Sequence, residues 1–322
     1  MRICFMGSPE FALPSLRRLI ESQHEVVAVF TQPDRPAGRG RKLAPPPVKA
    51  LALDHGLPVH QPKSISAPDV IEQIRALRPD LGVIAAYGQI LKQRLLDVPP
   101  LGVLNVHASL LPRWRGAAPI TAAILAGDAE TGATIMRVEL ALDAGPMLAS
   151  ARVPILPGDT TGTLTPKIAE AGAALLMDVL PKWQAGTIHA IEQDAALATY
   201  APRIEKRDGL INWERDDAST IARQVRAYHP WPSAYGYLDG APLRIIEAVA
   251  LAANGPVRPP GTIVETEADL RALDLSDVAF AVIAASGALG VMRVQPPGGS
   301  VMSAAAYLNG HRGIIGKRLT SG

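Results

Sequence analysis

The stretch Gly102–Pro119, GVLNVHASLLPRWRGAAP, is the one around which the chain is organised. Its first residues, VLNV, are apolar apart from Asn105, as in a buried strand, and the pattern breaks at Ser109. Asn105 and His107 are two residues apart, so a strand points both side chains to one face, about 7 Å apart. In an open α/β sheet, ligands bind at the carboxyl ends of the strands. We therefore expect an amide and an imidazole to meet one small reacting group there.

The segments before this stretch alternate between short apolar runs and helical patterns. The run Glu25–Thr31, EVVAVFT, is almost entirely apolar, as in a parallel sheet covered by helices on both faces. This alternation predicts an α/β fold with a doubly wound, Rossmann-like sheet. The turn after the first strand contains a single glycine, Gly7, and lacks the GxGxxG fingerprint, which disfavours a nicotinamide dehydrogenase.

The pattern changes after the connector Thr199–Asp208. Five short apolar runs separated by glycine and proline turns predict a small barrel or sandwich. They are Ser233–Leu238, Leu243–Leu251, Gly261–Val264, Val278–Ala284 and Leu289–Gln295. We therefore expect a catalytic domain over residues 1–203, a connector over 204–209 and a second domain over 210–322.

The composition excludes several classes of protein. The chain has 322 residues, 48% of them hydrophobic and 19% charged, enough for a sizeable core. One cysteine, Cys4, excludes an internal disulfide framework, and no cysteine cluster or HExxH motif suggests zinc or another metal. No apolar run reaches the roughly 18 residues of a membrane span, and the N-terminus has no signal-peptide pattern. We expect a cytoplasmic protein.

The net charge is only +2, so any affinity for nucleic acid must come from local patches. One candidate is the stretch Gln32–Lys49, interpreted as a long loop. Between Arg35 and Lys49 it carries five cations and no acid. The composition fits a solvated insert as well as it fits a loop that binds phosphates.

A third polar residue, Asp143, lies in a turn between two expected strands, and a return strand would bring it near His107. A carboxylate beside an imidazole fixes its tautomer, and an amide stabilises a developing oxyanion. No serine or cysteine lies in a nucleophile motif such as GxSxG, so this set favours acyl transfer without a covalent intermediate. The residues alone leave open that His107 is a hydrogen-bonded core residue and Asp143 an ordinary turn residue.

Longer motifs resemble one family. NVHASLLPRWRGAAPI and LDAGPML resemble the core signature and the aspartate loop of the 10-formyltetrahydrofolate-dependent formyltransferases. TQPDRPAGRGRKL and HPWPS resemble the branch of that family that formylates methionine on initiator tRNA. The resemblance covers nearly the whole chain, and it implies a second domain similar to an OB-like β-barrel that contacts the tRNA.

The resemblance also implies roles for residues. The catalytic set would be Asn105, His107 and Asp143. The tetrahydrofolate site would comprise Ser109, Leu110, Leu111 and Pro112 with Ala86, Tyr87, Gly88, Ile90 and Leu91. The tRNA would meet Arg35, Arg39, Arg41 and Lys42 of the basic insert and, on the ground of charge, Arg203, Lys206 and Arg207 of the connector. We expect the protein to act as a monomer.

Two other readings stay open on sequence. A formyltransferase acting on glycinamide ribonucleotide or on an amino sugar nucleotide would share the same core, although the basic insert and second domain disfavour it. A non-catalytic RNA-binding protein would need no chemistry from Asn105, His107 and Asp143, and an assay with the folate co-substrate separates the two classes.

Overall fold

The computed structural model describes residues 1–37, 42–252, 258–265 and 277–321. By backbone contacts the chain divides into two units. The first unit comprises residues 1–120, 129–155 and 163–202, and the second comprises 121–128, 156–162 and 203–322. The change of unit between residues 202 and 203 lies within the stretch Thr199–Asp208.

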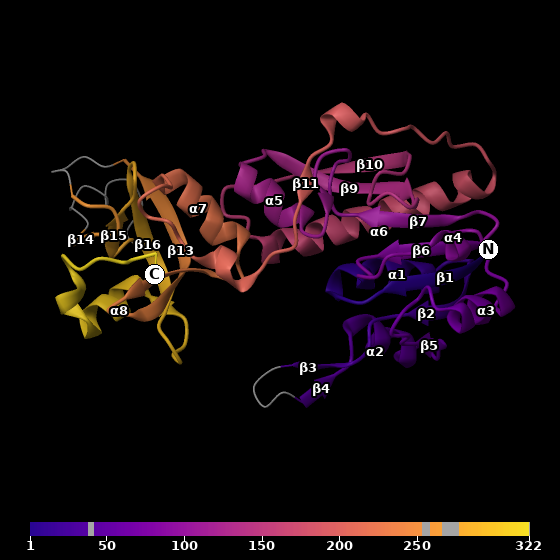
Figure 1. Cartoon of the computed structure of the whole chain (residues 1–322), viewed down its shortest axis with the longest axis horizontal. Helices are drawn as coiled ribbons and strands as arrows, with labels where there is room; N and C mark the ends of the chain where they lie inside the picture. The colour runs from indigo at the N-terminus through magenta and orange to yellow at the C-terminus, as the bar shows by residue number, and fades with distance from the viewer. Residues whose placement is uncertain (38–41, 253–257, 266–276, 322) are drawn as a thin grey trace. The chain divides into compact units, whose positions relative to one another are not determined.

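The first unit is built on one sheet, in which the described residues form seven strands in the order β10-β9-β7-β6-β1-β2-β5 (Figure 1). The strands are β1 (Arg2–Gly7), β2 (Glu25–Phe30), β5 (Val59–His60), β6 (Leu81–Ala85), β7 (Val103–His107), β9 (Glu130–Arg137) and β10 (Met147–Pro154). The run from β7 to β5 is parallel, whereas β9 is antiparallel to both β7 and β10. The chain order reverses beside β1, which confirms the doubly wound arrangement.

The helices of this unit begin where prolines or polar turns interrupt the strands. They are α1 (Leu13–Ile20) after the 3-10 turn η1 (Glu10–Ala12), α2 (Pro47–Asp54), α3 (Pro68–Ala76), α4 (Gln93–Leu96) and α6 (Thr161–Gln184), with η2 (Ala195–Leu197) beyond it. Most of α5 (Pro119–Ala126) is assigned to the second unit. Proline suits the first turn of α2 and α3 because its missing N–H would have no partner there. The apolar residues of β1 and β2 are buried, as the expected coverage on both faces requires.

The stretch expected as one long loop, residues 32–49, contains regular structure, so that expectation is wrong in detail. Its arms form an antiparallel hairpin of β3 (Arg35–Ala37) and β4 (Lys42–Ala44), and α2 already begins at Pro47. Pairing gives the two arms hydrogen-bond partners for backbone groups that a loop would leave to water. The tip between the arms lies outside the described residues.

The second unit is an antiparallel sheet in the order β12-β13-β16-β15-β14, with β17 beside β16. The strands are β12 (Ala234–Leu238), β13 (Ala241–Leu251), β14 (Ile263–Glu265), β15 (Phe280–Ile283), β16 (Ala288–Gln295) and β17 (Met302–Ser303). The first five match the five strands expected from the sequence. The other elements are η3 (Lys206–Gly209), α7 (Ala218–Ala227), α8 (Ala304–Gly310) and η5 (Arg312–Ile314).

The last residues join the two edges of this sheet. Thr320 exchanges two backbone hydrogen bonds of 2.9 Å with Tyr237 of β12. On the other edge, Ile263 donates to the carbonyl oxygen of Lys317 at 2.8 Å, and Leu319 donates to that of Gly261 at 2.8 Å. The sheet therefore curls onto itself around a core that includes Trp213. This agrees with the expected small barrel.

No helix among the described residues is long and apolar enough to cross a membrane.

Candidate active site

The site is built at the carboxyl end of β7. In register with its neighbours, Asn105 lies opposite Met136 of β9 and beside Ile84 of β6. Asn105 is partly exposed, whereas His107 is 5% exposed. The period of the strand places both side chains on one face, as the sequence predicts.

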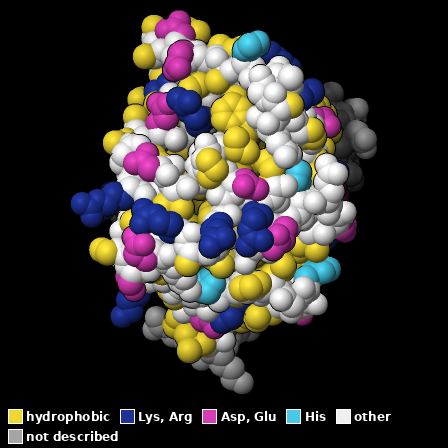
Figure 2. All heavy atoms as spheres, turned by 90° about the vertical axis from the view of Figure 1, so that its right-hand side faces the viewer, with side chains coloured by type: hydrophobic (Ala, Val, Ile, Leu, Met, Phe, Trp, Pro, Cys, Tyr) yellow, Lys and Arg dark blue, Asp and Glu magenta, His cyan; other side chains and the backbone are white. Residues whose placement is uncertain are grey.

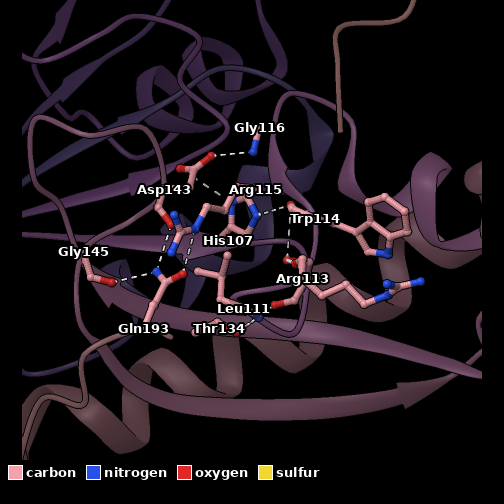
Figure 3. A network of polar contacts seen from close by, with 11 residues as sticks. His107, Leu111, Arg113, Trp114, Arg115, Gly116, Thr134, Asp143, Gly145 and Gln193 are labelled. Carbon is pink, nitrogen blue, oxygen red and sulfur yellow. Dashed lines mark hydrogen bonds and ion pairs between the residues drawn. The ribbon is translucent and has the colours of Figure 1, made fainter. Parts of the chain in front are cut away.

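The His107 ring is fixed through one nitrogen. Nε2 lies 2.9 Å from the carbonyl oxygen of Trp114 (Figure 3). A carbonyl only accepts hydrogen bonds, so Nε2 carries the proton of this contact. Nδ1 is the ring atom that faces Asp143, with 3.8 Å between Nδ1 and Oδ1. This separation is longer than a direct hydrogen bond, so Asp143 lies within electrostatic reach of the ring without closing off Nδ1.

Asp143 is held through its other carboxylate oxygen. The backbone N–H of Gly116 donates to Oδ2 at 2.8 Å (Figure 3). Gly116 belongs to β8 (Arg115–Gly116), which pairs with β11 (Tyr200–Ala201). A Cβ at Gly116 would lie 2.5 Å from the carbonyl oxygen of Ala201, and its φ is +111°, so only glycine fits. The strand pair thus presents an N–H to the carboxylate.

Ser109 and Thr134 tie down the loop after β7. Ser109 Oγ donates to the carbonyl oxygen of Arg113 at 2.6 Å. Thr134 Oγ1 donates to the carbonyl oxygen of Ser109 at 2.7 Å and accepts from the Leu111 N–H at 3.2 Å. Within the loop, the Arg113 guanidinium lies 4.3 Å from the centre of the Trp114 ring. These contacts restrain the loop so that the Trp114 carbonyl oxygen lies within hydrogen-bond distance of His107 Nε2.

The residues expected at the folate site divide into two groups. Ala86, Gly88 and Ile90 are exposed on the loop after β6, and Ile90 is 79% exposed. Leu110 and Pro112 are partly exposed. The remaining four, Ser109, Leu111, Tyr87 and Leu91, have buried side chains. These four residues are buried as a whole and belong to the core, and burial raises the pKa of the Tyr87 hydroxyl.

The expected tRNA-binding cations are exposed where the structure describes them. Arg35 is exposed and donates to Gln32 Oε1 at 3.3 Å. Arg203, Lys206 and Arg207 are exposed, and Arg207 forms a 2.9 Å ion pair with Glu205. Arg39, Arg41 and the side chain of Lys42 lie outside the described residues. Figure 2 shows the face of the first unit near the N-terminus. Basic side chains lie among acidic ones there, so this face does not carry a charge of a single sign.

The base of the hairpin is held by a network centred on Asp34. Lys49 Nζ donates to both oxygens of this carboxylate, at 2.9 and 2.8 Å, and to Gln61 Oε1 at 2.7 Å. Gln61 Nε2 donates to Asp34 Oδ1 at 2.7 Å. The hydrogen bonds from Lys49 and then Gln61 hold the pKa of Asp34 below its ordinary value. The network fixes where the hairpin leaves the sheet.

Sequence reasoning missed two side chains of the site. Gln193, from the segment between α6 and β11, contacts the loop of Asp143, and Arg115 contacts Gln193. No local pattern marks Gln193, because its partners are about 50 residues earlier in the chain. Arg115 is buried, which is unusual for arginine and marks it as a candidate site residue once the structure is known.

The fold and this set of groups define a class, and comparison with known families identifies it. Residues 1–180 match the family described as "Formyl transferase", and residues 203–312 match "Formyl transferase, C-terminal domain". The chain belongs to the formyl transferase family, which confirms the resemblance noted in the sequence.

Two relatives are similar over nearly their whole length. A protein of Methylococcus capsulatus named methionyl-tRNA formyltransferase is 51% identical over 319 residues, 99% of each chain. One of Chloroflexus aggregans with the same name is 47% identical over 310 residues, 96% of this chain and 97% of the relative.

Solved structures share the fold at low identity. HypX from Aquifex aeolicus, in complex with tetrahydrofolic acid, superposes with a TM-score of 0.63 at 18% identity, over 96% of this chain. The chain spans about half the length of that protein, 47%. An N-formyltransferase from Helicobacter canadensis, in complex with folinic acid and dTDP-3-aminofucose, gives 0.62 at 16% identity, over 90% of this chain and 99% of the other.

Proposed function

We propose that the chain transfers the formyl group of 10-formyltetrahydrofolate to the α-amino group of methionine carried by initiator tRNA, giving N-formylmethionyl-tRNA for translation initiation. The names of the relatives support this substrate, because their similarity extends over both units. The observation that carries the chemistry is the placement of His107 Nδ1 opposite Asp143 while Nε2 is bound to Trp114.

The amine needs little activation. A free α-amino group has a pKa of about 7.7–8.0, and the adjoining ester lowers it, so much of the nucleophile is neutral near pH 7. Its nitrogen attacks the formyl carbon on N10 of the folate, and the carbonyl oxygen becomes an oxyanion. The reaction therefore depends on stabilising that oxygen and on supplying a proton to the leaving nitrogen.

Each residue of the set has a role in this scheme. The Asn105 amide donates a hydrogen bond to the oxyanion, and His107 exchanges the proton through Nδ1. Asp143 favours the charged imidazole that forms during the transfer, because its Oδ1 faces Nδ1. The tetrahydrofolate would lie along Ala86–Leu91 and Ser109–Pro112. It would contact the residues of these segments that are at least partly exposed, and the buried ones would support them from the core.

The tRNA would bind through its phosphates. The charge is supplied by Arg35, Arg39, Arg41 and Lys42 of the hairpin, by Arg203 and by Lys206 and Arg207 of the connector. It positions the acceptor stem without specifying its sequence. In this proposal residues 1–203 form the catalytic domain, 204–209 the connector and 210–322 the tRNA-binding domain. The protein would act as a monomer in the cytoplasm.

The test is one assay with matched substrates. Purified protein is given 10-formyltetrahydrofolate with charged initiator tRNA, uncharged initiator tRNA, or charged elongator tRNA. Formylation of the charged initiator alone is the expected result. Formyl transfer to glycinamide ribonucleotide or to an amino sugar nucleotide instead, or folate-independent tRNA binding without turnover, would contradict the proposal.

A further inference from the structure

We propose that Gln193 is a positioning residue that holds Asp143 opposite His107, and that the segment between α6 and β11 is therefore part of the catalytic apparatus. The inference rests on the proposed function for its kinetic readout. It also predicts a change in the dynamics of the Asp143 loop, which needs no substrate.

Every polar group of the Gln193 side chain contacts the site. Nε2 donates to the carbonyl oxygen of Asp143 at 2.8 Å and to that of Gly145 at 2.7 Å (Figure 3). Oε1 accepts from Arg115 Nε at 2.9 Å. The amide fits in only one orientation, because a flip would face Oε1 toward two carbonyl oxygens and the NH₂ toward a guanidinium. A glutamine that merely covered the surface would not use both donors and its acceptor.

The Asp143 loop needs such a restraint. Asp143 has a φ of +49°, in the left-handed region that costs free energy for a residue with a side chain. The flanking Leu140 and Leu142 are each 62% exposed, so these two side chains contribute little packing to the loop. The hydrogen bonds from Gln193 to the backbone of Asp143 and Gly145 restrain this part of the loop.

The contacts form a closed ring around the carboxylate. Gly116 donates to Asp143 Oδ2, and its neighbour Arg115 donates to Gln193, which in turn donates to the Asp143 carbonyl oxygen. The carboxylate and the main chain of Asp143 are thus attached to the same two consecutive residues. This fixes the direction of the remaining oxygen, Oδ1, toward His107. A displacement of about 1 Å of a catalytic group costs on the order of 10²-fold in rate.

The experiment uses the full chain with three single variants. Gln193→Ala removes all three contacts. Gln193→Glu keeps the shape and an acceptor for Arg115 but loses both donors to the loop. Glu192→Ala, at the exposed neighbouring position, is the matched control. We expect kcat to fall about 10- to 100-fold in both Gln193 variants, the range found when a supporting partner is lost. KM for both substrates should stay within about twofold, and Glu192→Ala should match the wild type.

A double-mutant cycle separates positioning from general destabilisation. If Gln193 acts through Asp143, then Gln193→Ala should lower kcat less than about twofold in an Asp143→Asn background. Equal losses in the two backgrounds would overturn the inference, as would a loss of kcat that follows the folded fraction measured by thermal unfolding.

Amide hydrogen exchange of residues 138–146, measured without substrates, should become faster in Gln193→Ala and Gln193→Glu but not in Glu192→Ala. Unchanged exchange in this loop would also overturn the inference. An inactive wild type with the expected exchange pattern would instead contradict the proposed function and leave the role of Gln193 in the loop supported.

Discussion

Two loop carboxylates of the first unit are held in opposite ways. Asp34, after β2, receives direct hydrogen bonds from Lys49 on both oxygens and another from Gln61. Asp143, after β9, receives one from the Gly116 backbone, and its other oxygen stands 3.8 Å from His107 Nδ1. Asp34, with both oxygens hydrogen-bonded, anchors the base of the β3–β4 hairpin. Asp143 Oδ1 faces His107 Nδ1 without a direct hydrogen bond, so Nδ1 stays available for proton transfer.

The matched substitutions Asp143→Asn and Asp34→Asn test this contrast most directly. We expect Asp143→Asn to lower kcat by about 10²–10⁴, the range for loss of acid–base machinery, because the charge facing His107 is removed while the amide oxygen still accepts from Gly116. Asp34→Asn should leave kcat near that of the wild type and raise KM for tRNA. Steady-state kinetics with both substrates measure this, and similar kcat losses in the two variants would erase the distinction.

Asn105→Ala tests whether the Asn105 amide donates a hydrogen bond to the oxyanion. Loss of one such donor costs about 10²–10³ in kcat. We expect folate affinity, measured by equilibrium titration, to change far less. If turnover and folate affinity fall by the same factor, Asn105 is a binding residue and not an oxyanion donor.

Arg35→Ala tests whether the hairpin that Asp34 anchors meets the tRNA backbone. Removing one phosphate contact should reduce the slope of log Kd against log salt by about 1. Filter binding between low and physiological salt provides the slope, with Arg17→Ala on α1 as an exposed control. An unchanged slope in Arg35→Ala would exclude this residue from the interface.

The smallest effect we expect is a pH dependence of stability that comes from Asp34. Its pKa is held low by Lys49, so its contribution is present above the unfolded value of about 3.9 and is lost as the pH falls through the folded value. The urea midpoint of the wild type should therefore exceed that of Asp34→Asn near neutral pH and approach it in acid. A difference that grows on acidification would reverse the assigned sign.

The sequence predicts those parts of the site that follow from local periodicity. The two-residue spacing of Asn105 and His107 places both on one face of β7, and the apolar runs predict the strands that flank it. The approach of Asp143 follows from two expected strands and a return, although its 3.8 Å separation from His107 depends on the whole loop.

Other features have no local signal. The group that fixes the His107 ring is the backbone carbonyl of Trp114, and every residue has such a carbonyl. Gln193 acts across a long stretch of chain. The arms RPA and KLA of the hairpin are only three residues each, too short for a strand pattern, and Pro36 interrupts the first. Tyr87 and Leu91 are buried in a core cluster that includes apolar residues of α3, which no local pattern around them indicates.

The backbone bonds that Lys317–Thr320 form with both edge strands have a consequence for biosynthesis. All strands of the first unit precede residue 202, so its sheet is available for folding while the ribosome is still translating the remainder. The second unit lacks its closing segment until Leu319 and Thr320 have left the exit tunnel. A chain released a few codons earlier would therefore contain the complete sheet of the first unit. The sheet of its second unit would lack the bonds to both edges, and exposed strand edges promote aggregation.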